Sequence, residues 1–318
     1  MKSADELGEL KQIEGADWDV EIGAITEIGH HLGEQSRALV FDHIKGYPAG
    51  YRVLSNTLNT VKRMAMTLHM DTNYSRNGFV KDIKRHITDV KYVKPEVVKD
   101  GPVMENVFEG KDINMWKFPT PKWHELDGGR YIGTGSVDIT RDPDDGWVNL
   151  GTYRVMVHDE NTLGFYISPG KQGRIMREKY WAKGETCKVA VSFGQDPLLY
   201  LAGGMEVPHG VSEYDWVGGL SHHPVQVIQI DGRKPIECFL GIPGQECGSR
   251  ISQTFVIHAF KTLHIFLGHA IPYHVSRVQI CAFSHGVSCR PVVQKFDRFR
   301  SDRLWIVERD QCAALIVQ

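Results

Sequence analysis

Residues 149–154, with the sequence NLGTYR, place an amide and a guanidinium in an otherwise apolar stretch. If this stretch is one strand, Asn149 and Tyr153 share one face while Thr152 and Arg154 share the other. An amide oxygen suits a hard cation, and arginine offers a fork of donors to a carboxylate or phosphate. An arginine that simply faces solvent on a half-exposed strand is an equally good interpretation of Arg154.

A second polar segment, residues 203–214 (GGMEVPHGVSEY), combines paired glycines with a proline and a further glycine. Such a composition is typical of a loop whose backbone comes close to another group. Glu213 follows Ser212 and suits the first turn of a helix, where a carboxylate is favourable. The alternative is that Glu213 ligates a hard cation together with an amide oxygen such as that of Asn149.

The elements before residue 113 are predicted to be mixed α/β. Apolar residues at helical spacing predict a helix over residues 21–32, and short apolar runs predict strands at 38–41 and 51–54. Residues 60–70 read as a Met-rich helix, in which methionine is expected to fill gaps in the core. Residues 91–104 contain two prolines and are expected to form an extended connection.

From Trp116 onward, strands dominate the pattern. Alternation over residues 131–140, turn chemistry at 142–146 and further apolar runs predict an antiparallel meander. Meanders of this length often close into barrels. The remaining predicted elements are strands at 147–158, 163–168 and 188–193, a surface helix at 170–182 and a short helix at 198–202.

Length and composition restrict the class of protein. The chain has 318 residues, enough for two domains, and its 42% hydrophobic and 24% charged residues are ordinary for a globular protein. A formal net charge of -2 gives no electrostatic argument for nucleic acid binding. The sequence contains no run of about 18 uncharged apolar residues, so no membrane span is predicted. The charged N-terminus does not resemble a signal peptide. We therefore expect a cytoplasmic protein.

Three ordered blocks resemble the UbiD-type decarboxylases, which use prenylated FMN to remove the carboxylate of aromatic or unsaturated acids. The blocks are RYIGTGSVDITRDPDDGWVNLGTYR (130–154), LGFYISPGKQGRI (163–175) and GGMEVPHGVSEYDWVGGL (203–220). The resemblance covers residues 8–229. It implies α/β plus β architecture, with an N-terminal α/β domain (1–112) and an incomplete split β-barrel that binds flavin and metal (113–229). The family's C-terminal α/β domain is apparently missing.

The resemblance also implies a site. In the family, an asparagine, a histidine and a glutamate hold Mn²⁺ or Mg²⁺, which anchors the flavin phosphate; Asn149 and Glu213 match two of them. Gln172 falls in the loop where the histidine is expected, and either its amide oxygen replaces the imidazole or Lys171 contacts the phosphate directly. Arg154 matches the catalytic arginine. The remaining residues expected to contact the flavin are Thr152, Tyr153, Ser168, Pro169 and Met205, besides Arg154, Lys171 and Glu213.

After Gln229 the sequence departs from the family. A Pro-Ala-x-x-Glu segment with a catalytic glutamate is expected there, and a one-nucleotide shift in the possible codons of residues 242–247 would permit it. We interpret residues 230–318 as an atypical tail produced by a frame, splicing or sequencing fault, with genuine divergence as the alternative. The tail holds five of the six cysteines without a C-x-x-C spacing: Cys238, Cys247, Cys281, Cys289 and Cys312.

The implied function is a non-oxidative carboxy-lyase acting on a small aromatic acid, such as a hydroxylated benzoate, with prenylated FMN and a divalent metal. A flavin prenyltransferase would supply the cofactor, and a homo-oligomer is expected. The alternative is a truncated, catalytically silent protein that binds flavin and metal.

Overall fold

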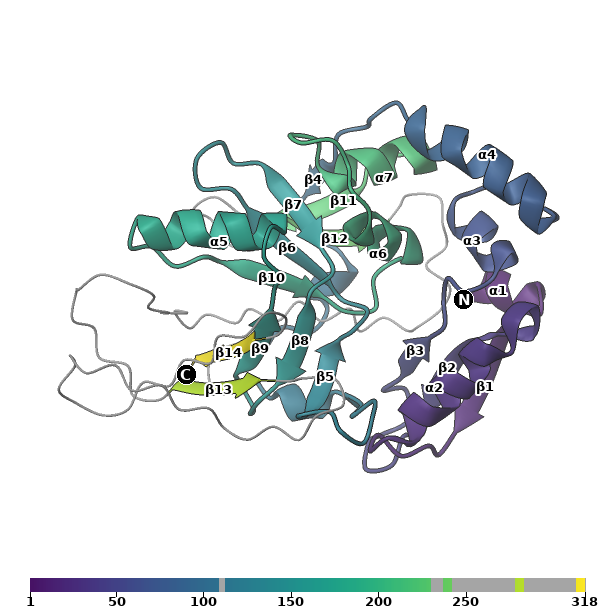
Figure 1. Cartoon of the computed structure of the whole chain (residues 1–318), viewed down its shortest axis with the longest axis horizontal. Helices are drawn as coiled ribbons and strands as arrows, with labels where there is room; N and C mark the ends of the chain where they lie inside the picture. Colours follow the sequence, from purple (N-terminus) through teal and green to yellow (C-terminus); the bar gives the residue numbers. More distant parts are fainter. Residues whose placement is uncertain (109–111, 230–236, 242–277, 283–312, 318) are drawn as a thin grey trace.

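The computed structural model describes residues 1–108, 112–229, 237–241, 278–282 and 313–317, in which helices and sheets are mixed (Figure 1). The helices are α1 Lys2–Glu6, α2 Glu21–His31, α3 Val61–Thr67, α4 Arg76–Thr88, α5 Gln172–Ala182, α6 Pro197–Gly204 and α7 Glu213–Ser221. The strands are β1 Leu10–Glu14, β2 Ala38–Asp42, β3 Val53–Ser55, β4 Glu96–Val98, β5 Arg130–Gly133, β6 Val137–Arg141, β7 Val148–Gly151, β8 Arg154–Val157, β9 Leu163–Tyr166, β10 Val189–Ser192, β11 Gln226–Gln229, β12 Glu237–Gly241, β13 Val278–Ala282 and β14 Ala313–Val317. None of the described helices has the length and apolar character needed to cross a membrane.

The N-terminal part forms a three-stranded sheet in the order β1-β2-β3. Strands β1 and β2 are parallel and are joined through α2, whereas β3 pairs antiparallel with β2. Every residue of β2 is buried, and Ile22 of α2 packs with Leu39 and Phe41 in a core of its own. The predicted helix at 21–32 and strand at 38–41 are thus confirmed.

Helices α3 and α4 do not contribute to that small core. Ala65, Leu68 and Phe79 share the largest core with buried residues of the central strands and of α6 and α7. Met64 and Met70 lie half-buried against this core, which confirms the prediction that methionine fills gaps here. The predicted boundary between domains at residue 112 stays a prediction.

The central strands form two sheets, ordered β10-β6-β7 and β13-β14-β9-β8-β5. All strand neighbours within both sheets are antiparallel. Helix α5 lies against the first sheet, where the Thr140 hydroxyl donates to the Met176 sulfur at 3.2 Å (Figure 1). The antiparallel pairing of neighbouring strands (β6 with β7, β8 with β9) and the helix at 170–182 are confirmed, but the strands are divided between two sheets and do not form the single predicted meander. Closure of the strands into a barrel stays a prediction.

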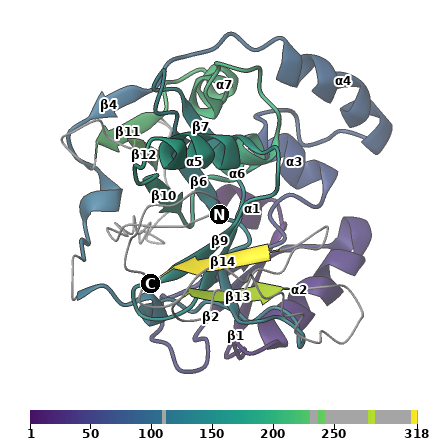
Figure 2. The ribbon, with the colours of Figure 1, turned by 60° about the vertical axis from the view of Figure 1, so that its left-hand side comes forward.

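A third sheet has the order β12-β11-β4, with β4 parallel to β11 and β12 antiparallel to it (Figure 2). Strand β4 lies within residues 91–104, so the expectation of an extended connection holds there, but this part also pairs as a strand, and Pro102–Met104 form a short 3-10 helix instead. Strands β12, β13 and β14 are the described parts of the predicted tail. Its other residues, including 242–247, lie outside the described part of the chain.

The prediction of one strand over residues 147–158 is wrong. Strands β7 and β8 belong to different sheets, and residues 131–140 divide in the same way into β5 and β6. The break has a local cause: the Tyr153 N–H donates to the side-chain carboxylate of Asp138 on β6 at 2.7 Å instead of to a backbone carbonyl of the ladder. Alternation in the sequence cannot reveal this change of sheet, because each half retains its apolar residues.

Arg130 joins the N-terminal part to the central strands. Its guanidinium lies 3.9 Å from the centroid of the Trp18 ring and 5.2 Å from that of Trp116. It donates to the Thr120 carbonyl at 2.6 Å and to the Tyr47 hydroxyl. Because an arginine can stack on aromatic faces while its N–H groups donate in plane, one residue links both parts of the fold.

The backbone at this junction is equally close. The Val20 N–H donates to the Lys122 carbonyl at 2.9 Å, and the Lys122 N–H donates to the Trp18 carbonyl at 3.0 Å. Gly23 of α2 packs directly against the backbone carbonyl of Trp123. A Cβ atom at position 23 would overlap the Trp123 carbonyl oxygen and lie 2.6 Å from the carbonyl carbon. Position 23 therefore requires glycine because the Trp123 backbone leaves no room for a side chain, not because of the backbone conformation.

We expect Gly23→Ala to lower the free energy of unfolding by about 3 kcal/mol, because a backbone carbonyl cannot move aside as a side chain can. Gly135→Ala is the matched control, since nothing lies within 4 Å of its added Cβ. Urea unfolding measures both. Equal stability of the two variants would show that α2 does not pack against residue 123 in this way.

Candidate functional site

Glu213 begins α7 and is almost fully buried, with 4% of its surface exposed. Ser212 caps the helix, and the Glu213 carboxylate reaches across to β7, where it accepts the Leu150 N–H at 2.8 Å. The helix-start interpretation of Glu213 is therefore confirmed. The Glu213 carboxylate thus contacts the backbone of Leu150, the residue that follows Asn149. The two predicted ligand residues, Asn149 and Glu213, are therefore neighbours in the structure.

Asn149 is buried on β7, and its amide NH₂ is held at two points. The NH₂ group donates to the Thr140 hydroxyl at 3.3 Å and to the Tyr153 hydroxyl at 3.4 Å. The amide oxygen is the atom left for another partner, and it is the atom that a hard cation would require.

Tyr153 connects Asn149 to helix α5. Its ring lies between two glycines: a Cβ atom at Gly151 would overlap the ring, and one at Gly173 would lie 2.6 Å from it. The Tyr153 hydroxyl accepts the Gly173 N–H at 2.9 Å, next to Gln172 at the start of α5. Burial raises the pKa of the Tyr153 hydroxyl, and the negative charges of Asp138 and Glu213 raise it further.

Asp138 is a member of the site that we did not predict. It is fully buried on β6, where its carboxylate accepts the Tyr153 N–H at 2.7 Å and the Ser136 hydroxyl at 3.4 Å. Burial raises the pKa of the Asp138 carboxyl to about 8. The available signal was a carboxylate inside an otherwise apolar strand, Val137 to Ile139, which needs a partner if buried.

The other predicted residues lie around this centre. Arg154 is exposed at the start of β8, and its guanidinium lies 5.6 Å from the centroid of the Tyr166 ring. Thr152 is exposed beside the end of α6, since a Cβ atom at Gly203 would lie 3.5 Å from its methyl group. Half-buried Met205 follows α6, and half-buried Ser168 leads with exposed Pro169 and Lys171 into α5.

The donor set fits a hard divalent cation with further ligands from outside the chain. Burial raises the pKa of the Glu213 carboxyl to about 7, and the charge of Asp215 adds to this effect. No side-chain cation within the described ranges pairs with Glu213. One carboxylate with the amide oxygens of Asn149 and Gln172 supplies only one negative charge, and no described group of three or more His, Cys, Asp or Glu side chains is placed to hold a metal.

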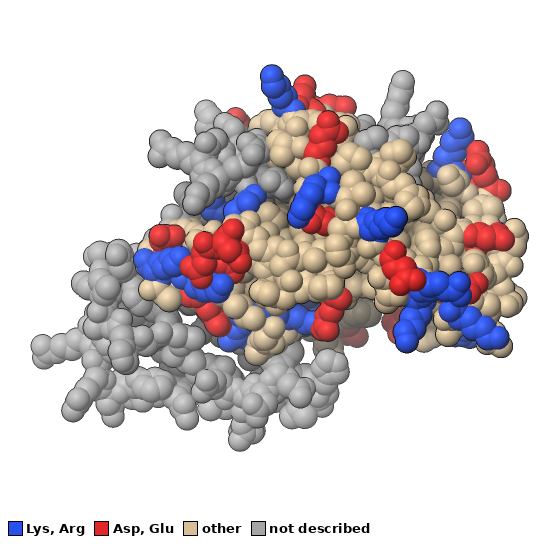
Figure 3. Space-filling view, turned by 90° about the horizontal axis from the view of Figure 1, so that it is seen from above, with Lys and Arg blue, Asp and Glu red and all other residues tan. Residues whose placement is uncertain are grey.

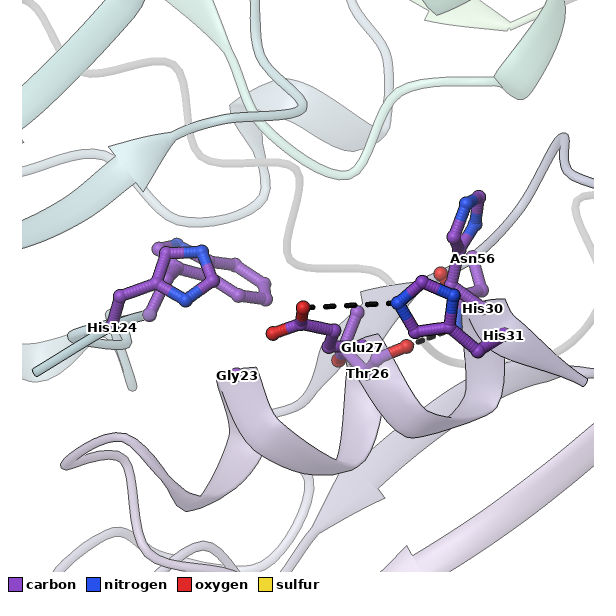
Figure 4. Close-up of a pocket in the computed structure, with 8 residues that line it drawn as sticks. Gly23, Thr26, Glu27, His30, His31, Asn56 and His124 are labelled. Carbon is purple, nitrogen blue, oxygen red and sulfur yellow. Dashed lines mark hydrogen bonds and ion pairs between the residues drawn. The ribbon is translucent and has the colours of Figure 1, made fainter. Parts of the chain in front are cut away.

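A separate hollow of about 460 Å³ lies at the junction of α2 with residues 123 and 124 (Figure 4). Glu27 pairs there with His31 at 3.8 Å, yet both side chains are more than half exposed. On the face shown in Figure 3, basic and acidic side chains are interspersed. Neither feature points to a ligand as specifically as the buried cluster around Asn149.

The described part of the chain is a mixed α/β fold with a cluster of oxygen-bearing side chains, Asn149 and Glu213 buried among them, that could hold a cation. Residues 96–238 match the 3-octaprenyl-4-hydroxybenzoate carboxy-lyase Rift-related domain, and residues 2–81 match the N-terminal domain of that carboxy-lyase. The chain belongs to the UbiD family. The two matches begin at residue 2 and end at residue 238, so they extend a few residues beyond both ends of the range of 8–229 that the sequence blocks indicated.

Several relatives carry names of decarboxylases, and two of them illustrate the similarity. The chain is 31% identical over 222 residues to pyrrole-2-carboxylic acid decarboxylase of Pseudomonas aeruginosa, covering 67% of this chain and 44% of the relative. It is 32% identical over 219 residues to phenolic acid decarboxylase of Sedimentibacter hydroxybenzoicus, covering 66% and 45%. The chain thus spans less than half the length of these two relatives.

Solved structures share the fold. The closed form of Sedimentibacter hydroxybenzoicus vanillic acid decarboxylase gives a TM-score of 0.70 at 28% identity, covering 76% of this chain and 52% of that one. A UbiD-class enzyme from Pelotomaculum thermopropionicum in complex with FMN gives 0.64 at 23% identity, covering 76% and 52%. The second likeness supports the fold alone.

The environment of Asp138 predicts a pH-dependent stability. The unfolded chain releases this proton near the ordinary pKa of 3.8, whereas the folded chain keeps it to about pH 8. Between these values the carboxyl favours the folded state less as pH rises. Asp138→Asn cannot ionise and keeps an acceptor for the Tyr153 N–H, so its melting temperature relative to the original chain should increase from pH 5 to pH 8.

Asp138→Ala serves as the comparison, because it leaves the Tyr153 N–H without its acceptor. Relative to Asp138→Asn, which also cannot ionise, it should cost about 1–3 kcal/mol at every pH. If Asp138→Asn followed the original chain at each pH in differential scanning fluorimetry, Asp138 would be ionised in the folded state, contrary to this account.

Proposed function

We propose that the chain is the flavin- and metal-binding part of a non-oxidative decarboxylase that acts on an aromatic, hydroxylated benzoic-type acid with prenylated FMN. The observation that carries the proposal is the buried pairing of Glu213 with the β7 backbone beside Asn149. Decarboxylases of phenolic and pyrrole acids among the relatives support the reaction and the substrate class. A flavin prenyltransferase would then be the source of the cofactor.

The charges of the site favour a cation that is shared with a phosphate. Glu213 contributes one negative charge, whereas Asn149 and Gln172 offer neutral oxygens, so bound Mn²⁺ or Mg²⁺ would retain an excess positive charge. Mg²⁺ in proteins commonly combines one or two carboxylates with ligand phosphates. Lys171, exposed at the N-terminal end of α5, adds a further positive group beside that helix terminus.

The flavin would lie against the residues that lead into α5, follow α6 and precede β8. The contacts with the flavin would come from Thr152, Ser168, Pro169 and Met205. The buried ring of Tyr153 would support them. Arg154 projects from the start of β8, where its guanidinium can pair with a substrate carboxylate. When bound, the modified flavin would act as the electron sink for the carbanion-like centre that remains after CO₂ leaves.

Return of a proton to carbon requires a general acid with a suitably adjusted pKa. The family resemblance puts that glutamate after Gln229, beyond the continuous described part of the chain. A second function is therefore proposed beside the first: a silent protein that binds flavin and metal without turnover. It is favoured by the sequence of residues 230–318, which contains no Pro-Ala-x-x-Glu segment.

Co-expression with a flavin prenyltransferase separates the two functions. Both predict a bound flavin in the absorbance spectrum of the purified chain, but only the decarboxylase predicts release of CO₂ from a hydroxybenzoate. A chain that is purified without flavin and that also fails to take up FMN with Mn²⁺ would contradict both proposals.

Glu213→Gln should weaken Mn²⁺ binding by at least about tenfold and should reduce retention of FMN on gel filtration with Mn²⁺, because the only carboxylate of the donor set becomes neutral. Glu206→Gln is the matched control, since Glu206 is an exposed carboxylate of the same loop. Isothermal titration of each variant with Mn²⁺ gives the affinities. Retention that is unchanged in both Glu213→Gln and metal-free buffer would remove Glu213 from the site.

A further inference from the structure

We propose that Tyr153 is a positioning residue, which fixes the amide of Asn149 and the first turn of α5 as one unit so that their oxygens can share a cation with Glu213. This inference rests on the proposed function, because it assigns a role within the same metal site. The inference concerns the hydroxyl group of Tyr153 and is separate from the expected contact between Tyr153 and the flavin.

The position of the ring is fixed by its neighbours. Gly151 precedes it on β7 and Gly173 faces it from α5, and a Cβ atom on either residue would collide with ring or hydroxyl atoms. The ring therefore fills the space between strand and helix. Its length sets how far the start of α5 lies from β7, and the Tyr153 side chain is buried as a result.

The hydroxyl oxygen receives a donor from each side. Gly173 of α5 donates its N–H at 2.9 Å, and Asn149 of β7 donates its NH₂ at 3.4 Å. An asparagine amide can turn over and exchange the places of its oxygen and nitrogen. Because the Thr140 hydroxyl donates its hydrogen to the Met176 sulfur, its oxygen can only accept from Asn149, which favours the orientation that leaves the Asn149 oxygen for a cation.

The backbone of Tyr153 is anchored independently. Its N–H donates to Asp138 at 2.7 Å, at the point where the chain leaves β7 for β8. With the main chain held by Asp138 and the ring held by two glycines, the hydroxyl has little freedom. Groups that orient a metal ligand in this way commonly change metal affinity by 10–100-fold when they are altered.

Tyr153→Phe tests the proposal, because it removes the hydroxyl and keeps the ring. In the full chain, titration with Mn²⁺ should show a loss of affinity of about 10-fold or more. Tyr200→Phe is the matched control: its hydroxyl donates to the Thr134 carbonyl at 3.4 Å and has no part in the site. This control should bind Mn²⁺ as the original chain does.

A double-mutant cycle with Asn149→Ala separates positioning from a general loss of stability. Because Tyr153 also holds the start of α5 through Gly173, Tyr153→Phe should cost less Mn²⁺ affinity in the Asn149→Ala background than in the original chain, since the part carried by Asn149 is already gone. The fall in melting temperature in EDTA that reflects the lost Gly173 bond should remain in the Asn149→Ala background.

The outcomes distinguish this inference from the proposed function. Loss of affinity in Asn149→Ala and Glu213→Gln with full affinity in Tyr153→Phe would overturn the positioning role alone. An equal further loss from Tyr153→Phe in the Asn149→Ala background would also overturn it. A chain that binds no Mn²⁺ at all would overturn both the positioning role and the metal site.

Discussion

The position of the Tyr153 ring between Gly151 and Gly173 is the constraint on which the candidate site depends. Glycine at both positions lets strand β7 and helix α5 approach the hydroxyl end of one ring. The phenol oxygen then joins Asn149 to the start of α5, while the Tyr153 backbone turns towards Asp138 and carries the chain into the second sheet. The same residue thus ends one strand, spaces a helix and orients a candidate ligand.

Two buried carboxyls surround this tyrosine, and their energetics differ. Asp138 keeps its proton to about pH 8 and serves the backbone of Tyr153, so its role is structural. Burial raises the pKa of Glu213 to about 7, and its carboxylate accepts the Leu150 N–H and its own backbone N–H but pairs with no side-chain cation within the described part of the chain. A buried carboxylate is costly without a compensating charge. A bound cation would supply that charge, which connects the burial of Glu213 to its proposed function.

The sequence predicts local elements well and long-range contacts poorly. The apolar spacing of Ile22 and its neighbours is enough to predict α2, and Asn149 and Glu213 stand out because polar groups are unexpected in such segments. The switch of sheets at Tyr153, the partner of Asp138 and the stacking of Trp18 on Arg130 all join residues distant in sequence or depend on one side-chain bond. Periodicity carries no information about such pairs. The family resemblance supplied what spacing could not, namely that Asn149, Gln172 and Glu213 belong to one site.

Membership of the UbiD family accounts for the fold of the chain, and the geometry around Asn149 supports the proposed cation site. The central claim is that a divalent cation held by Asn149 and Glu213 also holds the flavin phosphate. Electron–nuclear double resonance on the chain loaded with Mn²⁺ and FMN tests this most directly. The account predicts a phosphorus hyperfine coupling to bound Mn²⁺ that disappears in Glu213→Gln. Bound Mn²⁺ and bound FMN without any phosphorus coupling would contradict it.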